Sequence, residues 1–173
     1  GVVFYLRVIY MLYMRDEIAS PGSLKLDWSG QLAAVLAAAG TLDDAWAEIE
    51  TLAADPVVRA VGETGLDHFR TGVDGRAVQE EGFRRHIGLA KRLGKTLVIH
   101  DRDAHADVLR VLDDEVPPDR WVMHCFSGDA AFAQECLDRG GYMSFAGTVT
   151  FKGADDLRAA AAVVRGRKVA RNV

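Results

Sequence analysis

Three residues of the kinds that bind metal ions stand at the ends of separate apolar runs in this sequence. Glu63 follows the run VVRAVG, His100 ends the run TLVIH, and His124 is the fourth residue of WVMHC. A carboxylate at the end of a buried run needs a cation, a metal or several hydrogen-bond donors as its partner. Two imidazoles and a carboxylate suit Zn, Mn or Fe better than Ca. We therefore regard Glu63, His100 and His124 as candidate ligands of one metal ion.

Strand-like and helix-like patterns alternate along the chain, which predicts a parallel sheet with crossover helices. Helices are expected at residues 41–54, 76–93, 104–112, 130–137 and 154–164, and strands at residues 57–61, 96–100, 121–125 and 142–147. The carboxyl ends of parallel strands meet at one edge of a sheet, and neighbouring strands lie about 5 Å apart. Three ligands at such strand ends are therefore close enough to share one ion.

The architecture is expected to be either an open doubly wound sheet or part of a (β/α)8 barrel. A complete barrel typically needs about 250 residues, whereas this chain has 173 residues. With 49% hydrophobic residues the chain is rich enough for one core. We expect a single domain over residues 1–173 and, if it is a barrel, an incomplete one.

The net charge and the cysteine content indicate which kinds of surface and which cellular compartment are compatible with this sequence. A formal net charge of −4 argues against a broad basic surface for nucleic acid. It does not exclude a nuclease, because bound divalent ions supply positive charge where a phosphate must sit. Cys125 and Cys136 fit a reducing compartment, so a cytoplasmic location is expected.

The first 14 residues, GVVFYLRVIYMLYM, are very apolar and have Arg7 in their middle. A membrane-spanning helix needs about 20 apolar residues, so this segment is too short. It also lacks the basic start and the cleavage site of a signal peptide. A buried strand is the favoured interpretation, and no membrane partner is expected.

Three longer motifs resemble consecutive signature blocks of the TatD family of metal-dependent deoxyribonucleases. They read VGETGLDHFR, LVIHDRDAHADVL and MHCFSGDAAFAQECLDRGGYMSFAGTVTFK, and the resemblance extends over about residues 57–157. It implies a TIM-barrel-like (β/α)8 fold of the amidohydrolase type, with one or two divalent ions (Mg, Mn or Zn) that support hydrolysis of phosphodiester bonds in DNA. By this resemblance Glu63 matches the family's metal-bridging glutamate, and His100 and His124 match its two later histidine ligands.

Parts of the family pattern are absent from this sequence, which therefore resembles a truncated or divergent member. The family has a His-x-His pair after its first strand, but no histidine precedes His68 here. It also has a late aspartate in a run like ETDAP, which does not occur. A three-ligand zinc site with an open position remains compatible with the sequence. The general base, and with it the catalytic residue, stays unassigned.

Four further residues are candidates for contact with a metal ligand or with substrate. Asp67 is placed either to orient a ligand or a water, or to cap a turn. Arg102 either binds a phosphate or pairs with a neighbouring aspartate. Ser127 either presents its hydroxyl to an anion or caps the helix at residues 130–137. Lys152 follows the last strand block, where it is a candidate for facing the substrate.

Other polar residues are expected to lie outside the site. His86 and His105 fall within helical patterns and are predicted to be solvated. Cys125 directly follows His124, and side chains alternate along a strand, so a buried and unreactive thiol is predicted.

Two alternatives to a TatD-type nuclease stay open. Ligands at strand ends do not distinguish it from another amidohydrolase-like enzyme that acts on a C–N or ester bond. An incomplete barrel also leaves unpaired strand edges, which must be covered or must associate. The second alternative is therefore an inactive barrel that acts as a scaffold or assembly partner and self-associates through these edges.

Overall fold

The computed structural model describes residues 42–165, in which strands and helices alternate. The helices are α2 (Leu42–Ala54), α3 (Val73–Leu93), α4 (His105–Glu115), α5 (Ala130–Asp138), α6 (Asp155–Val164) and the short 3-10 helix η1 (Gly147–Thr150). The strands are β1 (Ala60–Asp67), β2 (Thr96–Arg102), β3 (Trp121–Met123) and β4 (Tyr142–Met143). The predicted strand at residues 1–14 lies outside the described residues. None of the helices between residues 42 and 165 combines the length and the apolar character needed to cross a membrane.

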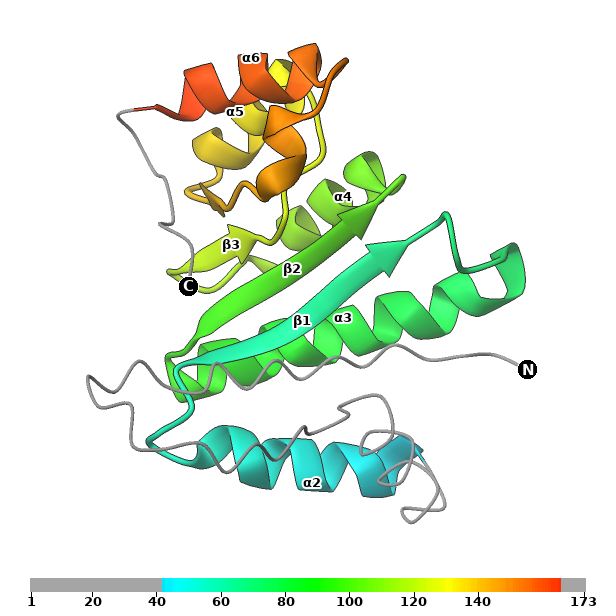
Figure 1. Cartoon of the computed structure of the whole chain (residues 1–173). Coiled ribbons are helices and arrows are strands. Elements are labelled where there is room, and N and C mark those ends of the chain that lie inside the picture. Colours follow the sequence, from blue (N-terminus) through cyan, green and yellow to red (C-terminus); the bar gives the residue numbers. More distant parts are fainter. Residues whose placement is uncertain (1–41, 166–173) are drawn as a thin grey trace, which may run out of the picture.

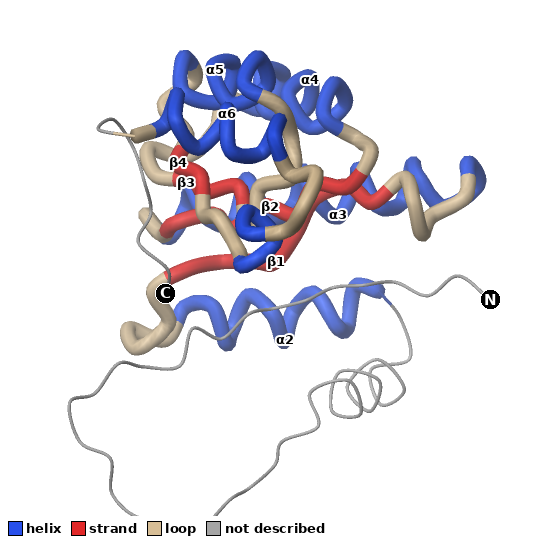
Figure 2. Tube along the Cα trace, turned by 45° about the horizontal axis from the view of Figure 1, so that its top comes forward, coloured by secondary structure: helices blue, strands red, loops and turns tan. Residues whose placement is uncertain are grey.

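The strands form one parallel sheet in the order β1-β2-β3-β4, with a helix in each connection. Helix α3 lies alongside β1 and β2, while α5 and α6 pack against each other (Figure 1). Figure 2 shows the helices lining the strands of this sheet. Residues 42–165 thus confirm the predicted parallel α/β fold, as part of a TIM-barrel-like arrangement.

Side chains alternate between the two faces of the sheet, so that two separate apolar clusters form. The larger cluster joins strand residues to the helices, and its strand members include Val61, Leu97, Ile99, Trp121, Met123 and Met143. The smaller cluster on the other face contains Ala60, Val98 and Val122 with the partly buried Tyr142. His100 follows Val98 by two residues on β2 and therefore shares the face of the smaller cluster.

Helix α3 ends where the sequence predicts. Gly94 has a φ of 61°, a left-handed conformation that glycine adopts without strain. Its N–H donates to the carbonyl of Lys91, and the N–H of Lys95 donates to the carbonyl of Ala90. These bonds satisfy the last turn of α3 and direct the chain into β2.

The strands differ from the prediction at their ends. The strand expected at residues 57–61 is instead β1, which starts at Ala60 and continues through Glu63 to Asp67. The register of β1 against β2 shifts between Val61 and Thr64, so a bulge carries the strand through the predicted turn. At the other edge, the strand expected at residues 142–147 is only Tyr142–Met143.

His86 is buried in the core, so the prediction that it is solvated is wrong. Its side chain is 1% exposed, because α2 covers this part of α3 and Trp46 packs edge-on against the imidazole, with ring centroids 4.8 Å apart. Nδ1 lies 2.7 Å from the carbonyl oxygen of Gly82. Within the described part of the chain, Nε2 has no hydrogen-bond partner. Burial lowers the pKa of His86 to about 4.

This shift predicts a pH-dependent stability that a His86→Leu variant should lack. Between the ordinary pKa of 6.5 and the folded value of about 4, the unfolded chain binds a proton that the folded chain does not. The free energy of unfolding of the wild type should therefore fall by roughly 3 kcal/mol more than that of the variant as the pH drops through this window. Urea denaturation at several pH values measures the difference. Equal pH slopes in the two proteins would contradict the assignment.

Candidate metal centre

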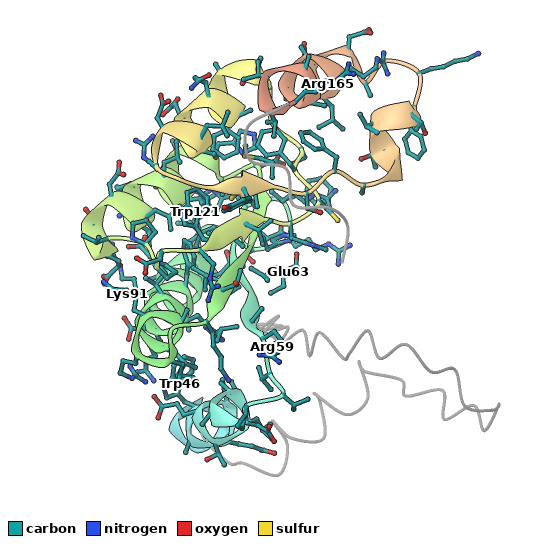
Figure 3. The ribbon with its side chains drawn as sticks, turned by 90° about the vertical axis from the view of Figure 1, so that its left-hand side faces the viewer. Trp46, Arg59, Glu63, Lys91, Trp121 and Arg165 are labelled. Atoms are coloured by element: carbon teal, nitrogen blue, oxygen red, sulfur yellow. The ribbon has the colours of Figure 1, made fainter. Side chains whose placement is uncertain are left out.

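Glu63 reaches the site because the glycine before it lets β1 bend closely against β2. Gly62 has a φ of 144°, and a Cβ there would lie 2.4 Å from the carbonyl oxygen of Val98. Only glycine fits both this conformation and this contact. Glu63 follows Gly62 at the bulge, and 6% of its surface is exposed. Figure 3 shows that Glu63 lies far from Lys91, which is near the end of α3. The glutamate thus lies within β1 rather than at its end.

The imidazole of His100 lies between two carboxylates of β1. Its Nδ1 is 2.8 Å from Oε1 of Glu63, and its Nε2 is 3.1 Å from Oδ2 of Asp67. The hydrogen bond to Glu63 is the main cause of a raised pKa at His100, with a further contribution from Asp67, while partial burial opposes the shift. The pair of carboxylates therefore favours the protonated imidazole.

Asp67 is held in place by the turn after β1 and by α3. Its Oδ1 accepts a hydrogen bond of 2.8 Å from the N–H of Arg70, which forms the predicted turn cap. Its own N–H donates to Oε1 of Gln79 at 2.9 Å. Asp67 thus caps the turn, which is one of the two roles considered for it, and contacts His100 at the same time. The sequence carries no signal for Gln79, which is 12 positions away along the chain.

His124 follows β3 and contacts β2 and its neighbour Cys125. The N–H of His124 donates to the carbonyl of Ile99 at 2.8 Å, which places its backbone beside β2. Its imidazole Nε2 lies 3.2 Å from Sγ of Cys125. The structure thus joins Glu63 and His100 with Asp67, whereas the contacts described for His124 are with Ile99 and Cys125.

Cys125 is exposed, so the prediction of a buried thiol is wrong. Strand β3 ends at Met123 and Cys125 has a φ of 49°, so the alternation of side chains along a strand no longer applies there. Desolvation and the nearby charge of Glu63 raise the pKa of the thiol, which keeps it protonated and weakly nucleophilic.

The other three substrate candidates occupy different settings. Arg102 is the last residue of β2, and its guanidinium lies over the ring of Phe69 instead of pairing with an aspartate. Ser127 is exposed, and Asp129 caps α5 by accepting a hydrogen bond from the N–H of Phe132. Lys152 is exposed in the turn after η1.

His105 belongs to a second imidazole–carboxylate pair, on the helix side of β2. Its Nδ1 contacts Oδ2 of the buried Asp101 carboxylate, and its ring stacks on Phe132 with centroids 4.2 Å apart. It is thus partly buried rather than solvated, and hydrogen bonding to Asp101 raises its pKa. The spacing of four residues between an aspartate and a histidine at a helix start is a signal that sequence analysis had available.

Glu63, Asp67 and His100, near the carboxyl ends of β1 and β2, are residues of the types that bind divalent metal ions. Two carboxylates and an imidazole are the ligands expected for Zn or Mn, and the burial of Glu63 favours a compensating positive charge. Within residues 42–165, no three His, Cys, Asp or Glu side chains are already arranged to hold an ion. Both nitrogens of His100 contact carboxylates, so this imidazole must release one of them to offer a lone pair.

Comparison with known protein families gives a match over most of the chain. The family described as "TatD related DNase" matches residues 33–169. The chain is 53% identical over 122 residues to the uncharacterized metal-dependent hydrolase TatD of Mycobacterium tuberculosis, covering 68% of this chain and 46% of that protein. It is 43% identical over 118 residues to the uncharacterized metal-dependent hydrolase YcfH of Escherichia coli, covering 68% and 44%.

A relative with a more specific name is the 3′-5′ ssDNA/RNA exonuclease TatD of Cronobacter turicensis. It is 41% identical over 110 residues, which cover 62% of this chain and 41% of the relative. The chain thus spans less than half the length of these curated relatives.

Solved structures show the same partial overlap. The TatD homologue YJJV of Escherichia coli matches with a TM-score of 0.63 at 28% identity, over 69% of this chain and 47% of that one. A TatD family hydrolase of Entamoeba histolytica matches with a TM-score of 0.57 at 23% identity, over 69% and 40%, and supports the fold alone.

Proposed function

Because the chain belongs to the TatD family, we propose that it is a metal-dependent hydrolase that cleaves phosphodiester bonds in DNA. The observation that carries this proposal is the group of Glu63, Asp67 and His100 beside the carboxyl end of the sheet. That position is where active sites lie in parallel α/β barrels. The exonuclease relative supports the choice of a nucleic-acid substrate.

In this proposal Glu63 and His100 are the residues that hold a divalent ion, and His124 is the third candidate ligand. When bound, a Mg, Mn or Zn ion supplies positive charge that polarises a phosphoryl oxygen and acidifies a water molecule. Asp67 orients the imidazole of His100 through the contact at 3.1 Å. Gln79 in turn fixes the backbone of Asp67. The two free cysteines support a reducing, cytoplasmic setting.

Hydrolysis of a labelled single-stranded oligonucleotide with added Mg, Mn or Zn tests the proposal. We expect turnover that EDTA abolishes and that a Glu63→Gln variant reduces by at least about 100-fold, because several kcal/mol of charge stabilisation are removed. The matched control is Glu81→Gln, which removes an exposed carboxylate on α3 that pairs with Arg85. Gel analysis of the products measures the rate for each protein.

Each negative outcome favours a stated alternative. Cleavage of a small amide but not of the oligonucleotide would indicate an amidohydrolase-like activity. No metal-dependent turnover on either substrate, together with a mass in light scattering that rises with concentration, would favour the scaffold role. That role has a structural basis, because β1 and β4 are the outer strands of the sheet formed by the described residues.

A further inference from the structure

An exposed aromatic ring stands directly beyond the proposed metal ligands. Phe69 follows β1 by two residues, and its side chain is 64% exposed. The guanidinium carbon Cζ of Arg102 lies 3.9 Å from the centroid of this ring. At that distance the guanidinium and the ring attract each other, so the arginine braces the phenylalanine on one side.

Arg102 differs from the other arginines around the sheet in its partners. Arg84, Arg110 and Arg139 each pair with two or more carboxylates. Across the described range 42–165, the guanidinium of Arg102 has no carboxylate partner, although Asp101 and Asp103 flank it in sequence. Its donors are therefore available to an anionic ligand.

The pair lies on the same side of the sheet as the candidate metal centre. Asp101 points to the helix side, where it contacts His105, so His100 and Arg102 both project to the opposite face. Two residues along a strand span roughly 7 Å. The N–H of His68 donates to the carbonyl of Arg102 at 2.9 Å, which fixes the turn that carries Phe69 against the end of β2.

We infer that Phe69 and Arg102 form a specificity site for an unpaired nucleotide next to the scissile phosphodiester. A nucleobase stacks on the part of the Phe69 ring that Arg102 leaves exposed, and Arg102 donates hydrogen bonds to the adjoining phosphate. Bases in a duplex are already stacked on their neighbours and cannot reach such a ring, so the site selects single strands. This inference rests on the proposed function, because it assigns the substrate of that same centre.

Binding of the full chain to two fluorescein-labelled strands in EDTA tests the inference without hydrolysis. One strand is an oligothymidylate of about ten nucleotides, and the other is an abasic strand of equal length. Phe69→Ala should weaken binding of the oligothymidylate by about 5- to 100-fold and leave binding of the abasic strand unchanged. Phe69→Trp should restore binding, whereas Phe69→Leu, which keeps an apolar side chain but no ring, should not.

The salt dependence of binding distinguishes the role of Arg102 from that of Phe69. Arg102→Ala should weaken binding of both strands and reduce the slope of log K against log salt by about 0.7, the value for one phosphate contact on a single strand. Phe69→Ala should leave that slope unchanged. Val116→Ala is the matched control, since Val116 is 65% exposed and lies between α4 and β3, at the amino end of the strands.

The outcomes distinguish this inference from the proposed function. If Phe69→Ala binds both strands as the wild type does, or loses affinity for both equally, base stacking at Phe69 is refuted. Metal-dependent cleavage of the abasic strand reports the hydrolysis itself, because that strand offers no base to stack. A wild type that cleaves neither strand yet shows the base-dependent loss in Phe69→Ala would overturn the proposed hydrolysis and support the binding site.

Discussion

A Gly65→Ala variant is expected to lose roughly 3–5 kcal/mol of folding free energy, a large share of the stability of a small domain. Gly65 has a φ of 144°, and a Cβ on it would lie 2.0 Å from the carbonyl oxygen of His100. That oxygen belongs to the backbone of the neighbouring strand, so it cannot move without opening the β1–β2 pairing. Denaturation midpoints in urea measure the loss.

Gly82→Ala is the control for this substitution. Gly82 lies in α3, and nothing lies within 4 Å of the position that its Cβ would take. Alanine is the better helix former, so this variant should gain about 0.5–1 kcal/mol. Similar stabilities for the Gly65 and Gly82 variants would show that β1 and β2 do not approach as closely as the structure indicates.

The second large effect is expected for the affinity of the chain for metal. His100→Ala should lower the affinity for Zn or Mn by at least about 100-fold, because loss of a ligand costs more than the 10- to 100-fold typical of a residue that only supports one. Isothermal titration and elemental analysis after dialysis measure the bound ion. His105→Ala is the matched control, since its imidazole pairs with Asp101 on the helix side of β2.

Equal losses in the His100 and His105 variants would contradict the proposed site. His124→Ala belongs in the same experiment, because the contact described for this imidazole is with Cys125 and its role as a ligand is a prediction. A loss as large as that of His100→Ala would assign His124 as a third ligand. An unchanged affinity would restrict the site to the β1–β2 group.

Local patterns in the sequence were sufficient for the elements and for their order. The apolar positions of α3 recur with a helical period, and Gly94 ends that helix with the left-handed conformation that glycine accepts. Short apolar runs between helices predicted parallel strands, and such runs are recognisable because both faces of a parallel sheet are buried. The polar residues beside these runs included Glu63, Asp67 and His100.

Long-range contacts decided which of those residues meet. His100 contacts Glu63 and Asp67 from 37 and 33 positions away along the chain. The bulge at Gly62 directs the side chain of Glu63 toward His100. A change of one residue in the register of β1 would place the Glu63 side chain on the other face of the sheet. No spacing rule predicts that Gln79 bonds to the backbone of Asp67, or that Arg102 lies over Phe69.

The same distinction explains why the predicted exposure of three side chains was wrong. His86 lies beside the apolar stripe of α3, and only the packing of Trp46 from another helix buries it. His105 depends on Asp101 and Phe132 for its partners. Cys125 is exposed because β3 ends two residues earlier. The sequence by itself determined periodicity and residue type, which are local properties; burial and hydrogen-bond partners arose only when distant segments packed together, so the tertiary structure alone decided them.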